Sequence, residues 1–204
     1  MKKISAILFD MDGVLFDSKK NMKKSWKDTN KKFNLNIDFE KYFSKIGVPF
    51  NDILEQLKIK ENNNKIKNFY KKKSILYKNL VKLYPRVKKT LNYLTKKKIK
   101  IGIVTSKDKF RTLQLIKRYN LNFSTIVCPS KNLRGKPYPD QILLALKKIK
   151  ASKKNTVYIG DTYIDLLAAK RSCVKFIFAK YGYGKIIDKK IVNIKNLSEL
   201  KKIY

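Results

Sequence analysis

The 204-residue chain contains no histidine, and this absence constrains its chemistry more than any other feature of its composition. Without imidazole, neither a Ser–His or Cys–His pair nor a histidine metal ligand is available. The chain has only two cysteines, Cys128 and Cys173, which lie far apart and form no CxxC pair. A disulfide framework and a zinc knuckle are therefore not expected. We expect both cysteines to be buried, reduced thiols.

Acidic residues are also scarce, with 15 Asp and Glu against 50 Lys and Arg and a formal net charge of +35. Such an excess suggests a polyanionic partner, either nucleic acid or an anionic membrane surface. The lysines, however, recur in nearly every segment instead of forming one stripe. We attribute them to genome base composition and expect no specific nucleic-acid partner, although a positive surface attracts anionic metabolites.

Long apolar runs are missing as well. The first residues, "MKKISAILFDMDG", imitate a signal peptide, but two aspartates interrupt the apolar run and no small-residue cleavage site follows. No later segment approaches the ~18 uninterrupted apolar residues of a membrane span. We expect a cytoplasmic protein that does not bind a membrane.

Hydrophobic residues make up 43% of the chain, with twelve Tyr and eleven Phe, which is enough for a substantial core. Short apolar runs with strand character alternate with amphipathic helical patterns. The runs cover residues 4–9, 99–104, 124–128, 155–160, 174–179 and 190–194. Strands that are apolar throughout and joined by helices indicate a parallel sheet covered on both faces. We expect an α/β fold with a Rossmann-like, three-layer core.

Residues 17–84 interrupt this alternation, because they show helical periodicity and no convincing strand. One helix contains Met22 and Trp26, a second ends at Gly47, a third follows it, and a long fourth extends from Ile66 to Leu83. We expect a four-helix cap at 17–84, inserted after the first strand of a core formed by 1–16 and 85–204.

Polar residues follow the strands of the expected core. They are Asp10 and Asp12 after the first strand, Thr105 and Ser106 after the second, Lys136 after the third, and Asp161 and Asp165 after the fourth. Open α/β sheets bind ligands at the carboxyl ends of their strands. These side chains, although distant in sequence, should therefore meet at one site.

Several carboxylates at one site require a cation, because each like-charge pair at ~4 Å costs on the order of 4 kcal/mol. Hard oxygen ligands favour Mg²⁺, which also accepts phosphate oxygens. Lys136 and Thr105 can hold the remaining phosphoryl oxygens. Because the chain lacks histidine, the available nucleophile is a carboxylate, which is already ionised at neutral pH. A second carboxylic acid two residues away can serve the leaving oxygen and then the attacking water.

Four motifs resemble the signatures of the haloacid dehalogenase superfamily of phosphatases. They are "FDMDGVLFDS", "IGIVTSK", "GKPYPD" and "GDTYIDLLAAK", in this order and at suitable spacing. The resemblance covers nearly the whole chain and is nearest to the phosphoglycolate phosphatase-like branch, whose members carry a helical cap where residues 17–84 lie.

The resemblance implies a role for each of the polar residues. It makes Asp10 the nucleophile and a Mg²⁺ ligand, and Asp12 the general acid and base with its main-chain carbonyl on the metal. It makes Asp161 a direct Mg²⁺ ligand and Asp165 an outer-sphere support.

The same resemblance makes Thr105 a phosphate-binding hydroxyl and Lys136 the residue that stabilises both nucleophile and phosphate. Ser106 stands where many members have Asn, which alters substrate contacts. "IGVPFNDIL" around Gly47 resembles the cap loop that faces the active site, so we expect Gly47 to contact substrate.

Two further departures from the family pattern bear on structure and reaction. Ser172 and Cys173 stand where the family often has Ala-Gly, at a position after a helix that favours positive φ, so we expect local strain or a shifted helix cap there. Met22 aligns with a histidine of the β-phosphoglucomutase branch, which argues against a mutase of that type.

We therefore expect a Mg²⁺-dependent phosphatase that hydrolyses a small phosphate monoester, of the phosphoglycolate or sugar-phosphate type, through an aspartyl-phosphate. Two alternatives stay open. One is a basic nucleic-acid- or membrane-surface-binding protein with a vestigial phosphatase site, and the other is a phosphomutase or pyrophosphatase of the same superfamily. The partner we expect is a small phosphorylated metabolite, and the sequence is compatible with a monomer or a homodimer.

Overall fold

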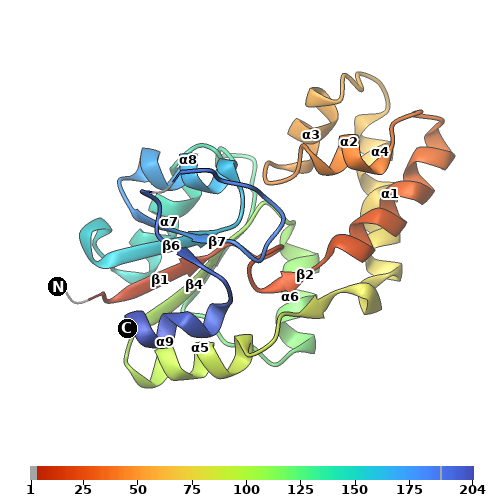
Figure 1. Cartoon of the computed structure of the whole chain (residues 1–204). Coiled ribbons are helices and arrows are strands. Elements are labelled where there is room, and N and C mark those ends of the chain that lie inside the picture. Colours follow the sequence, from red (N-terminus) through yellow and green to blue (C-terminus); the bar gives the residue numbers. More distant parts are fainter. Residues whose placement is uncertain (1–3, 189) are drawn as a thin grey trace.

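The computed structural model describes residues 4–188 and 190–204 of the chain. Its centre is a six-stranded parallel sheet with the strand order β5-β4-β1-β6-β7-β8 (Figure 1). The strands are β1 (Ala6–Phe9), β4 (Lys100–Val104), β5 (Thr125–Val127), β6 (Thr156–Gly160), β7 (Lys175–Ala179) and β8 (Asn193–Ile194). Each lies within one of the six apolar runs, so the expected α/β fold with a parallel sheet is confirmed.

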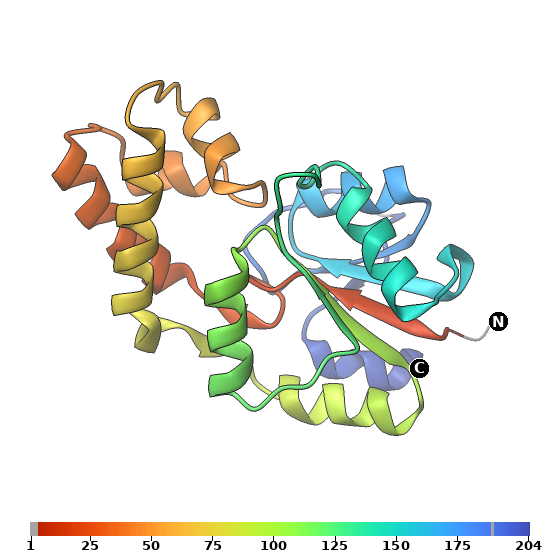
Figure 2. The same cartoon turned by 180° about the vertical axis from the view of Figure 1, so that it is seen from behind.

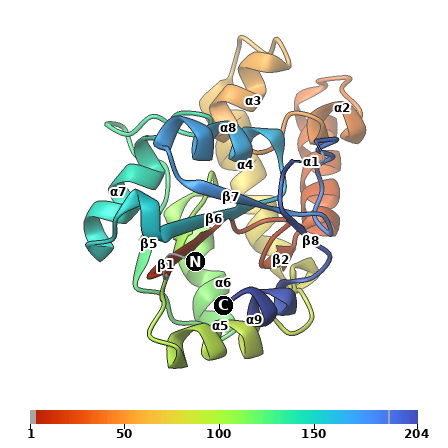
Figure 3. The ribbon, with the colours of Figure 1, turned by 60° about the vertical axis from the view of Figure 1, so that its left-hand side comes forward.

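Helices cover both faces of this sheet, as Figure 3 shows. On one face lie α5 (Val87–Lys96), α6 (Lys109–Arg118) and α9 (Leu200–Ile203), and on the other lie α7 (Asp140–Ile149) and α8 (Tyr163–Ser172). The central strand β1 contributes to both hydrophobic clusters, since Ile7 and Phe9 pack on the first face while Ala6 and Leu8 pack on the second. This two-sided burial explains why the strand is apolar throughout.

Four helices between the first strand and the rest of the sheet form a separate cluster beside it (Figures 1 and 2). They are α1 (Lys19–Phe33), α2 (Phe39–Phe43), α3 (Phe50–Gln56) and α4 (Asn63–Leu76). Trp26 anchors this cluster, because its ring stacks on Tyr42 at 4.2 Å and its indole N–H donates to the Ile37 carbonyl at 2.9 Å.

Two expectations for residues 17–84 were wrong. The segment does contribute strands, because β2 (Phe16–Asp17) pairs antiparallel with β3 (Lys82–Leu83) where the chain leaves and re-enters the sheet-containing part. The fourth helix also ends earlier than expected, at Leu76, and a 3₁₀ turn over Lys78–Leu80 follows it. Two-residue strands are too short for a hydrophobic period to reveal them.

The expectation of two buried thiols was also wrong, because Cys173 is exposed and Cys128 is partly buried. Cys173 ends α8 with a φ of 56°, in the left-handed region, and its N–H donates to carbonyls of the last helical turn. A residue in this capping position turns away from the helix and reaches solvent. The expectation of a strained backbone at Cys173 is thereby confirmed.

None of the helices in the described part of the chain has the length and hydrophobicity that crossing a bilayer requires.

Replacing the strained residue should stabilise the protein. A left-handed conformation costs an L-residue roughly 1 to 2 kcal/mol, while glycine adds about 0.4 to 1 kcal/mol of entropy to the unfolded chain. We expect Cys173→Gly to raise the free energy of unfolding by roughly 0.5 to 1 kcal/mol in urea denaturation. Cys173→Ala is the matched control, because it removes the thiol and keeps the strain. Equal stability of the two variants would contradict the assignment.

Candidate active site

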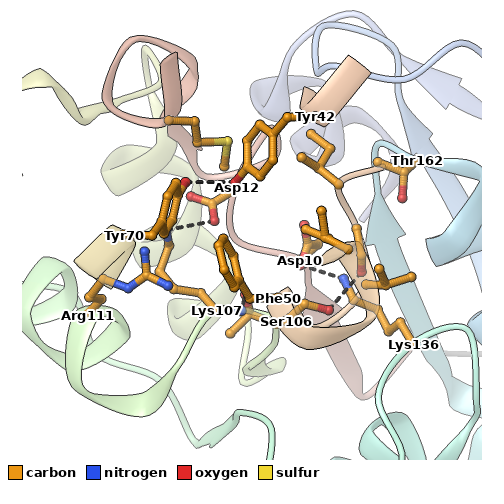
Figure 4. A pocket seen from close by; sticks show the side chains of 16 residues that line it. Asp10, Asp12, Tyr42, Phe50, Tyr70, Ser106, Lys107, Arg111, Lys136 and Thr162 are labelled. Atoms are coloured by element: carbon orange, nitrogen blue, oxygen red, sulfur yellow. Dashed lines mark hydrogen bonds and ion pairs between the residues drawn. The ribbon is translucent and has the colours of Figure 1, made fainter. Parts of the chain in front are cut away.

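The polar residues that follow the strands meet at the carboxyl edge of the sheet. Asp10 and Asp12 come directly after β1, Thr105 after β4 and Asp161 after β6, while Lys136 reaches the same place from the loop after β5. Asp10, Asp12, Thr105 and Lys136 line a pocket that the helical cluster closes from the other side, and Figure 4 shows Asp10, Asp12 and Lys136 in it. The structure therefore brings together the residues that the strand-end argument selected.

Lys136 lies at the centre of this site and is fully buried. Its Nζ contacts Asp10 Oδ1 and Asp165 Oδ1, each at 2.7 Å, and the Tyr158 hydroxyl at 3.3 Å. Burial alone would lower the pKa of Lys136, but attraction to the two carboxylates raises it. The ammonium group therefore stays charged and fixes the position of Asp10.

Asp165 is oriented by its own helix as well as by Lys136. Thr162 and Asp165 form a capping box at the start of α8, in which Asp165 Oδ2 accepts from the Thr162 N–H at 3.1 Å and from its hydroxyl at 2.6 Å. Asp165 Oδ1 accepts from Lys136 and from Tyr158, the latter at 2.8 Å. With both oxygens engaged in this way, Asp165 fits a supporting position better than a direct metal ligand.

Asp10, Asp161 and Asp165 form a buried cluster in which one oxygen from each lies within 4.8 Å of the others. Burial raises the pKa of Asp10 to about 7, with Asp165 adding to the rise and Lys136 opposing it. Burial, followed by repulsion from Asp165 and Asp10, raises the pKa of Asp161 well above its ordinary value. One lysine cannot balance three ionised carboxylates, so without a cation the folded state favours protonated carboxyl groups in this cluster.

Asp161 shows where a cation fits. Its Oδ2 accepts from the Tyr183 N–H at 2.7 Å, but its buried Oδ1 has no hydrogen-bond partner among the described residues. An unpartnered carboxylate oxygen beside two more carboxylates is a suitable environment for a hard divalent cation. Gly13, with a φ of 87°, makes this arrangement possible, because a side chain there would collide with the Asp161 carboxylate.

Asp12 is held apart from this cluster by other partners. Its Oδ1 accepts from the Ser18 hydroxyl at 2.5 Å, and its Oδ2 forms an ion pair of 2.9 Å with Lys107. Lys107 also donates its main-chain N–H to the Thr105 hydroxyl at 3.1 Å. The two acids of the opening motif thus face different cations, Lys136 for Asp10 and Lys107 for Asp12.

Ser106 and Gly47 connect the two sides of the pocket. The Ser106 hydroxyl donates to the Gly47 carbonyl at 2.7 Å, and both residues line the pocket. The loop that contains Gly47 also continues into Pro49, which packs so closely on Gly135 that a side chain there would collide with it. The cap loop therefore lies directly on the segment that carries Lys136.

The sequence argument missed several pocket residues. They are Lys107 and Arg111 from the sheet-containing part and Tyr42 and Tyr70 from the helices. Phe50 and Ile53, which also line the pocket, belong to "IGVPFNDIL", the segment that the sequence predicted to face the site. Met22 also lines the pocket. Lys107 directly follows "TS" in "IGIVTSK", which was a signal, whereas nothing in the sequence distinguished Arg111 from other basic helix residues.

A family model described as haloacid dehalogenase-like hydrolase matches residues 7–179. The chain therefore belongs to this family, which confirms the resemblance seen in the four motifs. The chain is 29% identical over 174 residues to "Pyrophosphatase PpaX" of Oceanobacillus iheyensis, covering 84% of this chain and 81% of that protein. It is 30% identical over 187 residues to "Phosphoglycolate phosphatase" of Aquifex aeolicus, covering 88% and 86%. These relatives confirm a hydrolase of the phosphatase type.

Solved structures agree with this fold. A hydrolase from Pseudomonas syringae superposes with a TM-score of 0.87 at 25% identity, over 98% of this chain and 97% of that chain. A haloacid dehalogenase-like family hydrolase from Streptococcus pneumoniae gives a TM-score of 0.85 at 22% identity and covers all of both chains.

Replacing the Asp161 carboxyl with a neutral amide should stabilise the protein when no divalent cation is present, because the folded state resists ionisation of this carboxyl and the unfolded chain does not. In Asp161→Asn the amide oxygen can keep the Tyr183 hydrogen bond, and the amide N–H₂ replaces the unpartnered oxygen beside Asp10 and Asp165. We expect the free energy of unfolding in EDTA to rise by roughly 2 kcal/mol, and the melting temperature by about 4 to 8 °C. Added Mg²⁺ should stabilise wild type and not the variant. An Asp161→Asn variant less stable than wild type in EDTA would contradict an energetic cost of burying this carboxyl.

The raised pKa of Asp10 predicts a pH dependence of stability without divalent cations. The folded state holds a proton on Asp10 up to about pH 7, whereas the unfolded chain releases it near 3.8. The free energy of unfolding should therefore fall, by about 2 to 4 kcal/mol, as pH rises from about 4 to 7. Urea denaturation in EDTA at several pH values between about 4 and 7 measures this change in the free energy of unfolding. Asp10→Asn should reduce this slope, and a slope equal to that of wild type would exclude Asp10 as its cause.

Proposed function

We propose that the chain is a Mg²⁺-dependent phosphatase that hydrolyses a small phosphate monoester through a phosphorylated Asp10. The observation that carries this proposal is the buried contact of 2.7 Å between Lys136 and Asp10, beside a carboxylate cluster that a cation would neutralise. In this proposal residues 1–16 and 85–204 form the catalytic core and residues 17–84 form its cap.

The first step is attack of the Asp10 carboxylate on phosphorus. Lys136 holds Asp10 Oδ1, which leaves Oδ2 for the new bond, and the bond from phosphorus to the leaving oxygen breaks. Lys136 and the buried Thr105 offset the negative charge of the phosphoryl oxygens. Mg²⁺, held by Asp10, Asp161 and the main-chain carbonyl of Asp12 with Asp165 in support, would supply further charge neutralisation.

Asp12 handles the protons of both steps. It donates a proton to the leaving oxygen, and then takes a proton from the water that attacks the phosphorus of the aspartyl-phosphate. Ser18 and Lys107 fix its orientation through both of its oxygens. After the second step Asp10 is again a free carboxylate and inorganic phosphate leaves.

The pocket supports a small substrate. Its volume is about 70 Å³, well below the roughly 300 Å³ at which pockets for drug-sized ligands begin. Pyrophosphate hydrolysis is the second candidate, since the relative named "Pyrophosphatase PpaX" aligns with most of the chain and pyrophosphate is also small. Hydrolysis of a phosphate monoester and hydrolysis of pyrophosphate differ in the leaving group and use the same residues to transfer the phosphoryl group.

Activity measurements test this proposal. With p-nitrophenyl phosphate and a panel of phosphorylated metabolites, we expect Mg²⁺-dependent release of phosphate, and Asp10→Asn should lower kcat by at least about 10³-fold. Asp38→Asn is the matched control, because Asp38 is exposed and its amide can still cap α2. Turnover that persists in EDTA or in Asp10→Asn would overturn the proposed mechanism.

A further inference from the structure

The pocket has a second polar end that the phosphoryl-transfer residues do not use. Arg111, Tyr42 and Tyr70 gather there, across the pocket from Lys136, as Figure 4 shows. The Tyr42 hydroxyl donates to the Tyr70 hydroxyl at 2.8 Å, so the Tyr70 hydroxyl proton is free to be donated to another group. Phe50 and Ile53 add apolar surface nearby, which strengthens electrostatic interactions in this region.

Arg111 is held in one orientation from behind. Asp108 caps α6 by accepting the Arg111 main-chain N–H at 3.1 Å, and its other oxygen accepts Arg111 Nε–H at 2.5 Å. The guanidinium carbon lies 5.6 Å from the centre of the Tyr70 ring. The Arg111 side chain is only 13% exposed, so its charge is largely removed from water.

This arrangement leaves part of the guanidinium available. Nε–H is the one guanidinium group that forms an ion pair or a hydrogen bond of standard geometry with the described residues. Burial raises the pKa of Tyr70, and the charge of Arg111 together with a hydrogen bond between the two side chains opposes this rise. A nearly buried guanidinium with five N–H donors, of which these contacts use only some, is suited to bind an oxyanion through two parallel hydrogen bonds.

Lys107, the neighbouring cation, is not available in the same way. Its ammonium group pairs with Asp12 at 2.9 Å, and its side chain is 6% exposed. Arg111 is thus the pocket cation that neither Asp10 nor Asp12 directly engages.

We propose that Arg111, assisted by the Tyr70 hydroxyl, is a specificity-determining residue that binds a second oxyanion of the substrate. This inference rests on the proposed phosphatase function and narrows it. The site selects small molecules in which a carboxylate or a second phosphoryl group lies a few bonds from the phosphoryl group that is transferred. The small pocket supports this spacing, because it keeps both ends of the substrate close together. Phosphate esters of neutral alcohols lack the second anion and bind more weakly.

Matched substrates test the inference. Phosphoglycolate and ethyl phosphate are of similar size and differ in the carboxylate, while pyrophosphate carries a second phosphoryl group. Phosphoglycolate and pyrophosphate carry a second anionic group. We expect Arg111→Met to lower kcat/KM about 10- to 100-fold for the one of these two substrates that wild type prefers. For ethyl phosphate the change should stay within about threefold. Tyr70→Phe should reduce the same preference by a smaller factor.

Arg118→Met is the matched control, because Arg118 is on the same helix and does not line this pocket. Its preference between substrates should equal that of wild type. An equal loss of activity on all three substrates in Arg111→Met would mean that Arg111 only supports the structure, and would overturn the inference.

A binding measurement separates this inference from the proposed function. Phosphonoacetate and ethylphosphonate are stable to hydrolysis and differ in the same carboxylate. We expect wild type to bind phosphonoacetate at least about tenfold more tightly by calorimetry, and Arg111→Met to remove this difference. If no substrate is turned over but this difference holds, the proposed function fails and the second oxyanion site stands. If wild type binds both phosphonates equally, the inference fails whatever the activity.

Discussion

The buried ammonium group of Lys136 is the interaction on which the site depends. It connects three segments that are distant in sequence, because it contacts Asp10 after β1, Tyr158 in β6 and Asp165 in α8 while its own main chain belongs to the loop after β5. Removal of one partner from a buried ion pair leaves an uncompensated charge and commonly costs about 3 to 5 kcal/mol. Correct folding of the sheet and correct placement of Asp10 therefore have the same cause, which is that these charges can be buried only together.

The buried carboxyl groups that the proposed reaction uses also lower the stability of the protein. Asp10 and Asp161 would each be easier to bury in the neutral form, as their raised pKa values show. An amide at position 161, which is not a partner of Lys136, would make a more stable protein without a cation. Carboxyl groups that are costly to ionise in the folded state are useful only where a cation and a phosphoryl group later occupy the site, because they provide ligands that are already in place.

The sequence predicted the parts of the molecule that repeat a pattern or follow a strand. Six apolar runs gave six strands, and the strand-end rule selected Asp10, Thr105 and Asp161. The two-residue strands β2 and β3 could not be predicted, since pairing between distant segments forms them and no period does. The place of Arg111 in the pocket could not be predicted either, because it depends on packing against Tyr70 of another helix and the chain contains 50 Lys and Arg from which to choose. Local sequence patterns predict helices and strands, whereas the end of the pocket that contains Arg111 is formed by tertiary contacts.

Acidic residues are scarce in this chain, so the positions of the few that are present are informative. The chain has only 15 Asp and Glu against 50 Lys and Arg. Four of these acids lie in or beside the site, namely Asp10, Asp12, Asp161 and Asp165. A chain with few acids thus places several of them where they could hold a divalent cation. The basic surface attracts small anions from a distance, but it cannot distinguish one anion from another. Discrimination requires a cation whose direction is fixed, and in this pocket Asp108 fixes the direction of Arg111. In the proposed scheme, the general charge therefore favours capture of anions, and acids such as Asp108 that orient individual basic side chains determine which anion is retained.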